Sequence, residues 1–427
     1  MARILAYQSP TEGHVFPSTG MLLELRDRGH DMHVRTLSSQ VETLAALGLH
    51  AAPVDPRLEA IDLEDWREHS QIEAMKRVVE FYDRTAEVDL PDMKRALDEV
   101  HPDALIVDMQ SEGAAAVAEA SGLPWAIYCP YPPPMRSVDA PPHGQGLKPA
   151  RGPLGRLRDH ALHAYGRRFL KPHVAHRNRL RATLGLSPIE RYEEQWLAAD
   201  RFLALTAEPY EYYRRDWAPS VRLVGPGTWE PPAEPPEWLS AEQRPIVLVT
   251  ASTAYQHDGK LIATALEAFA GEDVALVATT AANDPAQFGT PPPNARLEAF
   301  LPHGPIIERA ACVVCHGGQG TTQKSLAAGV PVCVVPFSRD QFDVARRVEA
   351  SGSGAWLHHK RLSPERLRAK AHEAIGKRAG AQRVARGFEA AGGSSAAADA
   401  LEEILPDADP DAGASAGADS VRAASPG

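Results

Sequence analysis

The sequence predicts an α/β protein made of two halves, each a parallel sheet with helices packed on it. Segments typical of strands and of helices alternate over residues 3–129 and again over residues 245–375. A Pro-rich stretch, residues 225–239 (GPGTWEPPAEPPEWL), separates the halves and has the composition of a stiff, extended connector. We therefore expect two facing Rossmann-like domains joined by a linker, with a cleft between them.

The first half opens with an apolar strand at residues 3–8 and a loop containing Pro and Gly at residues 9–14. Apolar residues at helical spacing predict a helix at residues 16–28, and Gly29 ends it. The same alternation and further Gly stops predict strands at residues 31–36, 104–108 and 124–129, and helices at residues 38–47 and 112–121.

A different composition marks the middle of the chain. Residues 130–153 are dense in Pro and Gly and predict a loop. Residues 154–184 are rich in Arg and His, with apolar residues at helical spacing. They predict either an amphipathic helix with a solvated basic face or a helix that lines a ligand cleft.

After the linker the strand–helix alternation restarts. It predicts strands at residues 245–250, 274–279, 311–315 and 330–336, and helices at residues 259–270, 321–328, 341–351, 364–375 and 386–404. The predicted divisions are residues 1–225 for the first domain, 226–241 for the linker, 242–385 for the second domain, 386–404 for a C-terminal helix that can pack back on the first domain, and 405–427 for a low-complexity, disordered tail.

Charge and composition exclude several classes of protein. The formal net charge of −11 and a pI near 5.9 disfavour binding to the phosphate backbone of nucleic acids. Neither a secretory signal nor an uninterrupted apolar run of about 18 residues is found, so we expect a cytoplasmic protein that does not cross a membrane and keeps its thiols reduced. Cys312, Cys315 and His316 spell the C-x-x-C-H of haem attachment, but the apolar residues around them favour a buried strand.

The strongest local motif, HGGQGTT, lies between an expected buried strand and an expected helix. The carboxyl ends of parallel strands are where α/β sheets bind ligands, and a helix N-terminus offers free N–H groups to an anion. The motif predicts an anion-binding turn, with a plain tight turn as the alternative, and it matches neither the Walker phosphate loop nor G-x-G-x-x-G. The residues that would form it are His316, Gly317, Gly318, Gly320, Thr321 and Thr322.

Other polar residues follow the ends of expected strands. Asp340 and Gln341 come just past one strand, where they would hold hydroxyl groups of the same ligand or lie in a solvated loop. His14 follows the first strand, and Asp108 ends another strand of the same sheet. Because the carboxyl ends of parallel strands meet at one edge, Asp108 could orient the imidazole of His14 as a general base, although a lone His is often structural.

Residues 316–341, HGGQGTTQKSLAAGVPVCVVPFSRDQ, resemble the donor-binding signature of family 1 glycosyltransferases of GT-B fold, in particular the bacterial macrolide and antibiotic glycosyltransferases. The GHVFP run after the first strand, the PDALIVD strand and the Pro-rich linker match that family in the same order. The resemblance extends to about residue 400.

This resemblance implies an acceptor-binding first domain and a second domain that binds a nucleotide sugar. It implies that His14 is the catalytic base and that Asp108 is its carboxylate partner. Phe300-Leu301-Pro302-His303 replaces the Trp-x-Pro-Gln run that contacts the nucleobase in many relatives. The positions that match the donor site are Ser252, Thr253, His316, Gly317, Gly318, Gly320 and Thr321 for the diphosphate, Asp340 and Gln341 for the sugar hydroxyls, and Phe300, Pro302 and His303 for the base.

The implied reaction is an inverting transfer from a UDP- or dTDP-sugar to a hydroxyl of a small, mostly apolar natural product. It uses no cofactor and no metal, because the Asp-x-Asp triplets of the sequence, Asp407 to Asp409 and Asp409 to Asp411, fall in the expected tail. The protein is expected to act as a monomer or homodimer. A nicotinamide dehydrogenase would need G-x-G-x-x-G, which is missing, whereas a GT-B nucleotide-sugar epimerase and a non-catalytic auxiliary relative are alternatives.

Overall fold

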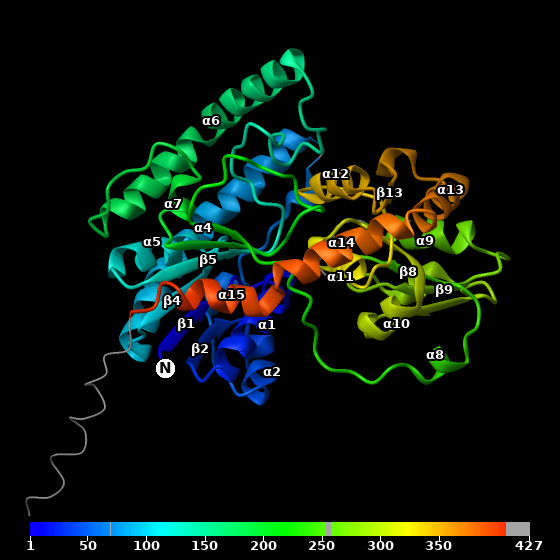
Figure 1. Ribbon diagram of the computed structural model, residues 1–427, viewed down its shortest axis with the longest axis horizontal. Coiled ribbons are helices and arrows are strands. Elements are labelled where there is room, and N and C mark those ends of the chain that lie inside the picture. The colour runs from blue at the N-terminus through cyan, green and yellow to red at the C-terminus, as the bar shows by residue number, and fades with distance from the viewer. Residues whose placement is uncertain (69, 253–257, 407–427) are drawn as a thin grey trace, which may run out of the picture.

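The computed structural model describes residues 1–68, 70–252 and 258–406. In this part of the chain, seven strands form a first sheet in the order β3-β2-β1-β4-β5-β6-β7, and six form a second in the order β10-β9-β8-β11-β12-β13. Neighbouring strands are parallel in both sheets. The two helix-covered sheets lie side by side (Figure 1), which confirms the predicted α/β architecture of two Rossmann-like domains.

The inner strands of the first sheet are apolar because helices cover both of its faces. The strands are β1 (Arg3–Tyr7), β2 (Asp31–Thr36), β3 (His50–Pro53), β4 (Ala104–Asp108), β5 (Trp125–Cys129), β6 (Arg201–Ala204) and β7 (Val221–Leu223). The helices of this half are α1 (Glu12–Asp27), α2 (Val41–Ala46), α3 (Pro56–Glu59), α4 (Gln71–Val100), α5 (Glu112–Ser121), α6 (Pro153–Ala182) and α7 (Glu194–Leu197), with the short 3-10 helices η1 (Ser38–Gln40) and η2 (Asp65–Arg67).

The second sheet begins after the linker. Its strands are β8 (Ile246–Thr250), β9 (Ala275–Thr279), β10 (Ala295–Glu298), β11 (Ala310–Cys315), β12 (Val332–Val334) and β13 (Gly354–Trp356). The helices are α8 (Glu237–Ala241), α9 (Gly259–Ala268), α10 (His303–Arg309), α11 (Gln319–Ala327), α12 (Gln341–Ser351), α13 (Pro364–Ile375), α14 (Arg378–Ala391) and α15 (Gly393–Glu402), with η3 (Pro285–Phe288) and η4 (His359–Arg361). Cys312 and Cys315 are buried in β11, as the strand interpretation of C-x-x-C-H predicted.

The strand order places a ligand-binding edge in each sheet. In the first sheet, β2 and β3 lie on one side of β1, and β4 and the later strands lie on the other. The second sheet reverses its strand order in the same way between β8 and β11. Ligands of open α/β sheets bind at such reversals, beyond the carboxyl ends of the strands. The loops that follow these four strands carry the residues that the sequence singled out.

Several predicted boundaries differ from the structure. α1 begins at Glu12, four residues before the predicted start, although Gly13 and Pro17 are poor helix formers. Tertiary packing of α1 overrides these local preferences. The 30-residue α4, which contains Pro91, and β3 were not predicted, because helix-breaking and polar residues obscured their patterns.

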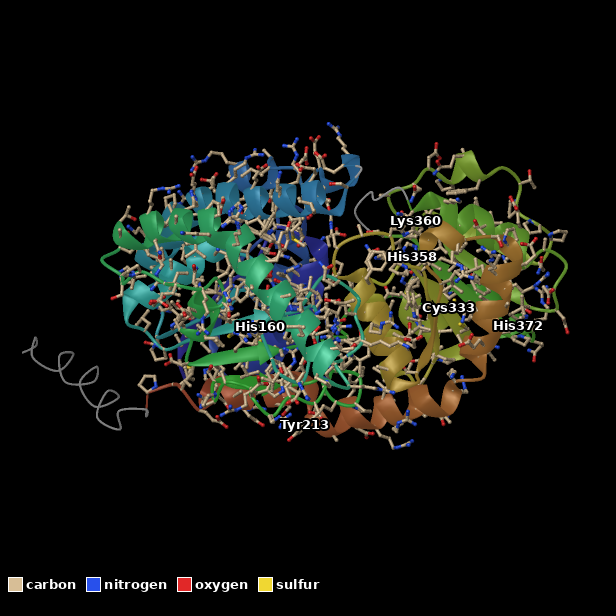
Figure 2. The ribbon with its side chains drawn as sticks, turned by 90° about the horizontal axis from the view of Figure 1, so that it is seen from above. His160, Tyr213, Cys333, His358, Lys360 and His372 are labelled. Atoms are coloured by element: carbon tan, nitrogen blue, oxygen red, sulfur yellow. The ribbon has the colours of Figure 1, made fainter. Side chains whose placement is uncertain are left out.

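The single helix predicted at residues 386–404 is wrong. Two helices, α14 and α15, meet at Gly392, whose φ of +90° lies in the left-handed region that Gly adopts readily. α15 packs on α1 of the first domain, and Arg28 donates hydrogen bonds to Asp399 and Glu402 at 2.6 and 2.7 Å. Figures 1 and 2 show these two helices passing from the second domain to the first.

α6 is the predicted Arg/His-rich helix, and its amino-terminal half projects from the first domain (Figure 1). Leu154 is 83% exposed and Leu157 is 64% exposed, so this half has a solvated face. Although α6 is 30 residues long, neither it nor any other described helix is apolar enough to cross a membrane.

Candidate active site

His14 and Asp108 form a hydrogen-bonded pair at the ligand-binding edge of the first sheet. His14 lies in the first turn of α1, and Asp108 is the last residue of β4. Their Nδ1 and Oδ2 atoms are 2.8 Å apart. The carboxylate is fully buried and also accepts the backbone N–H of Gln110 at 2.8 Å. Because an ionised carboxylate only accepts hydrogen bonds, Nδ1 of His14 is the donor in this pair.

Aromatic rings extend from His14 toward the second domain. The ring of Tyr131 lies 5.7 Å from that of His14 and 6.4 Å from that of His143, measured between centroids. Burial raises the pKa of the Tyr131 hydroxyl, so this side chain is neutral at neutral pH. His143 in turn lies 3.2 Å from the carboxylate of Asp343 on α12. No motif or spacing in the sequence predicted this row of side chains.

The HGGQGTT motif forms the turn between β11 and α11. Gly317 has a φ of +100°, and a Cβ there would lie 2.8 Å from Val334 Cγ1, so only Gly fits. Gly318 is the N-cap of α11 and has no side chain that could cap the first N–H groups of the helix. Gly320 and Thr321 lie in that first turn. The N-cap of α11 therefore supplies no side-chain cap, which is the feature on which the prediction of an anion-binding turn rests.

His316 and the end of β8 lie together beside this turn. Cys315, the residue before His316, is in register with Thr250 at the end of β8. The N–H of Ser252 donates to the buried Asp258 at 2.5 Å, so these two residues lie together just beyond β8. Burial lowers the pKa of His316, opposed by the charge of Asp258. Thr253, also predicted to contact phosphate, lies outside the described residues.

The predicted nucleobase segment follows β10. Phe300 is 79% exposed, and Pro302 is the N-cap of α10. Nε2 of His303 lies 3.0 Å from the hydroxyl of Thr279, and burial lowers the pKa of His303 to about 4. His303 is therefore a neutral, partly buried side chain, whereas Phe300 is largely exposed.

Asp340 and Gln341 open α12, next to the HGGQGTT turn. The side-chain oxygen of Gln341 accepts the backbone N–H groups of Phe337 and Ser338 at 2.8 and 3.1 Å, and so closes the loop before the helix. The backbone oxygen of Gln341 would lie 3.2 Å from a Cβ on Gly317, which places the two loops in contact. Burial raises the pKa of Asp340 above the usual range of a carboxyl group.

The two edges face one another across the domain boundary. Burial raises the pKa of Tyr82 on α4, and the charges of Asp108 in the first domain and Asp340 in the second raise it further. Direct interdomain contacts include the ion pair between Asp65 and Arg339 at 2.6 Å. The loop before Asp340 and Gln341 is thus in contact with the first domain through Asp65 and Arg339, two residues that the sequence analysis assigned no role.

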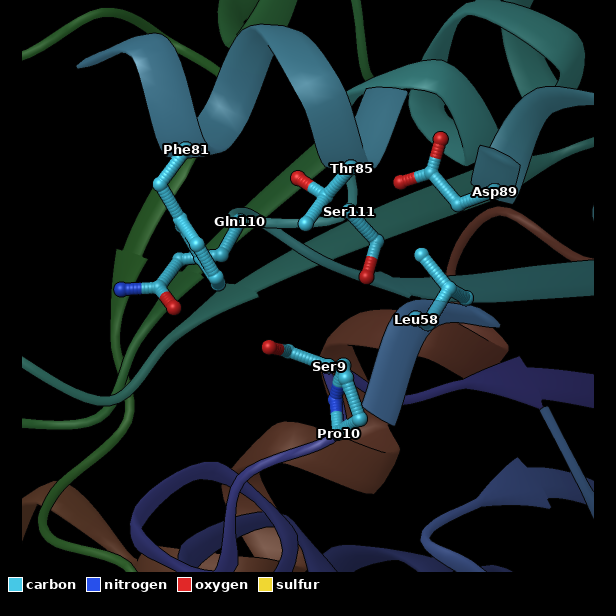
Figure 3. A pocket seen from close by; sticks show the side chains of 8 residues that line it. All are labelled: Ser9, Pro10, Leu58, Phe81, Thr85, Asp89, Gln110 and Ser111. Atoms are coloured by element: carbon cyan, nitrogen blue, oxygen red, sulfur yellow. The ribbon is translucent and has the colours of Figure 1, made fainter. Parts of the chain in front are cut away.

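A small cavity lies between the loops that follow β1 and β4 and the helices α3 and α4 (Figure 3). Its free volume is about 10 Å³, the space of one water molecule. Ser9 and Pro10 follow β1, Gln110 and Ser111 follow β4, and the remaining walls are side chains of α3 and α4. Those side chains are Leu58, Phe81, Thr85 and Asp89.

Comparison with known proteins identifies the family. Residues 263–404 match the family model described as "Erythromycin biosynthesis protein CIII-like, C-terminal domain". The chain is 31% identical over 386 residues to the 4'-demethylrebeccamycin synthase of Lentzea aerocolonigenes, covering 86% of this chain and 90% of that protein. It belongs to the bacterial antibiotic glycosyltransferases. The demethyllactenocin mycarosyltransferase of Streptomyces fradiae is 25% identical over 431 residues, covering 95% of this chain and 87% of that protein.

The fold of this glycosyltransferase also matches solved structures. The crystal structure of the glycotransferase of kitacinnamycin superposes with a TM-score of 0.73 and 23% identity, over 95% of this chain and 99% of that one. The predicted GT-B fold is therefore confirmed. Because the chain belongs to a family of glycosyltransferases, it is an enzyme that transfers a sugar. This assignment replaces the epimerase and auxiliary-protein alternatives.

Proposed function

We propose that this glycosyltransferase moves a sugar from UDP or dTDP to a hydroxyl group of a small, mostly apolar natural product, with inversion and without a metal ion. The observation that carries this proposal is the 2.8 Å hydrogen bond between His14 and the buried Asp108 at the edge that faces the donor turn. The names of the relatives, a rebeccamycin synthase and a mycarosyltransferase, support an antibiotic-like acceptor.

His14 would act as the general base. An alcohol hydroxyl has a pKa far above neutrality, so a base must take its proton as attack begins. With Nδ1 held by Asp108, Nε2 accepts that proton, and the buried carboxylate stabilises the imidazolium that forms. Direct attack by the acceptor on the anomeric carbon inverts its configuration.

The second domain would hold the donor and stabilise the leaving nucleoside diphosphate. The uncapped N–H groups at the start of α11 and the imidazole of His316 are preorganised donors for the negative charge that grows on the leaving group. Phe300 would stack on the nucleobase with its exposed ring. Asp340 and Gln341 would accept and donate hydrogen bonds to the sugar hydroxyls.

Mass-spectrometric screening tests this proposal. The purified protein is incubated with a panel of UDP- and dTDP-sugars and a panel of aromatic and macrolide alcohols. We expect a product heavier than one acceptor by one glycosyl unit, with the anomeric configuration opposite to that of the donor by NMR. Retention of configuration, or transfer only from other nucleotide classes, would contradict the proposal.

A further inference from the structure

An ion pair links the first domain to the loop that carries the proposed sugar-binding residues. Nε and Nη2 of Arg339 donate to the two carboxylate oxygens of Asp65 at 2.8 and 2.6 Å. Asp65 lies in η2 of the first domain, and Arg339 lies between β12 and α12 of the second. The Asp65 side chain is only 2% exposed. Two parallel hydrogen bonds to a buried carboxylate fix the relative orientation of both groups.

The backbone of Arg339 adopts an unfavourable conformation. Its φ is +52°, in the left-handed region where a side chain with a Cβ is disfavoured. Such a conformation persists only where the surroundings hold it. Here the Asp65 carboxylate holds the side chain, and Gln341 holds the backbone of Phe337 and Ser338.

The next two residues in the chain are the proposed sugar ligands, Asp340 and Gln341. A second interdomain contact lies on their other side, where the carboxylate of Asp343 accepts the N–H groups of Gly144 and Gly146 at 2.6 and 2.7 Å. The first domain therefore contacts the chain at Arg339, immediately before Asp340 and Gln341, and at Asp343, two residues after them.

We propose that Asp65 and Arg339 are positioning residues that latch the sugar-binding loop into place when the domains face each other. This inference rests on the proposed function, because it assigns the loop to the donor sugar. The latch would make donor-sugar recognition depend on the approach of the acceptor domain. A pair that only stabilises the interface would instead affect unfolding without changing which part of the donor is recognised.

Calorimetric titration separates the sugar from the nucleotide. UDP and UDP-glucose, and dTDP and dTDP-glucose, are titrated into the wild type and into Asp65→Asn, Arg339→Gly and Arg339→Lys. We expect Asp65→Asn and Arg339→Gly to weaken binding of the nucleotide sugar about tenfold relative to the free nucleotide, which the turn at α11 holds. Arg339→Gly relieves the backbone, so a loss in this variant reports on the side chain.

Two further variants complete the experiment. The charge swap Asp65→Arg with Arg339→Asp should restore the ratio of nucleotide-sugar affinity to nucleotide affinity to within about threefold of the wild-type ratio. Lys148→Ala removes a different interdomain pair, Lys148 with Glu349 at 3.6 Å, which lies outside the loop, and should leave the ratio unchanged. Equal ratios in the wild type and Asp65→Asn would overturn the latch while leaving the proposed function intact.

Hydrogen exchange tests the latch without a ligand. Amides of residues 337–341 should exchange faster in Asp65→Asn than in the wild type. If the wild type binds no nucleotide sugar, the proposed function fails, and this measurement still decides whether Asp65 holds the loop. Unchanged exchange there would overturn the latch.

A second inference concerns the opposite edge of the first sheet. Asp31 and His33 point to the same face of β2, since side chains alternate along a strand, and His50 of β3 is the register partner of His33. Nε2 of His33 and Nε2 of His50 lie 3.2 and 3.3 Å from the two carboxylate oxygens of Asp31. All three ligand atoms lie within 4.8 Å of one another.

We propose that these side chains bind one divalent transition metal ion, such as Zn²⁺ or Ni²⁺. Two imidazoles and a carboxylate are a donor set that suits these ions, and the 67% exposed side chain of His50 leaves the site open to solvent. Nε of Arg3 also donates a hydrogen bond to Asp31 at 2.9 Å. The site lies at the amino ends of β1 and β2, away from His14.

Titration of the chelator-treated, tag-free protein with ZnCl₂ or NiCl₂ tests this site. We expect one equivalent to bind, and His33→Ala and His50→Ala each to weaken binding at least about tenfold. His372→Ala, which removes an exposed imidazole on α13, should bind as the wild type does. Lack of binding by the wild type, or equal binding by His33→Ala, would overturn the proposal.

Discussion

At the scale of single residues, the acid–base chemistry depends on one nitrogen of His14. We predict that His14→Ala folds normally and loses about 10²–10⁴-fold in transfer rate to alcohol acceptors, the usual contribution of a general base. Steady-state kinetics with a fixed donor measures this. His30→Ala, which removes an imidazole paired with Glu402 beside α15, is the control and should retain activity. Near-normal turnover in His14→Ala would disprove the base assignment, unless the acceptor is an already ionised phenol.

His316 gives a second prediction at this scale. His316→Ala should weaken UDP or dTDP binding about 10- to 150-fold, because one hydrogen bond to a charged group is worth about 1.5–3 kcal/mol. Acceptor affinity should stay nearly unchanged, since the acceptor would bind the first domain. Calorimetric titration of nucleotide and acceptor separately gives both values, and equal nucleotide affinity in a folded variant would make His316 structural only.

We predict that binding of the donor sugar depends on pH through the carboxyl group of Asp340. Burial raises its pKa, and the carboxylate accepts sugar hydroxyls better when it is charged. The additional affinity that the sugar contributes should therefore be greatest above the raised pKa. It should fall as the pH drops through that pKa, at a higher pH than for an ordinary Asp. The ratio of nucleotide-sugar to nucleotide affinity, measured from pH 7 to pH 4, reports this. Asp340→Asn should show a lower ratio without the acid transition, and a wild-type ratio independent of pH would contradict the assignment.

At the scale of elements, the turn between β11 and α11 depends on the absence of a side chain at Gly317. We predict that Gly317→Ala lowers the free energy of unfolding by about 1–3 kcal/mol and also weakens nucleotide binding, because φ of +100° and the contact with Val334 disfavour a Cβ. Urea unfolding measures the first effect and calorimetry the second.

Gly166 provides the matched control for this substitution. It lies inside α6, and a Cβ there would meet no atom within 4 Å. Gly166→Ala should therefore be neutral or stabilise the protein by up to about 1 kcal/mol. If both variants were equally stable, the backbone argument for the turn would fail.

At the scale of the whole molecule, the proposed reaction needs both domains and no metal. We predict that transfer persists in excess EDTA, because the diphosphate would be neutralised by the start of α11 and by His316. Chelation would remove metal from the proposed Asp31–His33–His50 site without changing how the donor is bound. Activity lost in EDTA and restored by Mg²⁺ or Mn²⁺ would show that a metal takes part in transfer.

The sequence determined the elements whose signals are local. Apolar runs and Gly stops predicted β1, β4, β11 and α5, because the pattern that marks each element lies within its own segment, although the strands pair with distant ones. The order of strands and loops also predicted the pairing of His14 with Asp108, since parallel strands end at one edge. Family membership followed from the motif of residues 316–341.

The tertiary structure decided what depends on distant residues. α15 and its contact with Arg28, the latch between Asp65 and Arg339, and the cross-strand pair of His33 and His50 join parts of the chain with no shared local pattern. Local propensity reports on the backbone of a short segment, whereas an ion pair or a break at a Gly is selected by the packing of elements far apart in sequence. For that reason the sequence predicted the chemistry at each edge, and the fold alone decided how the two edges are held together.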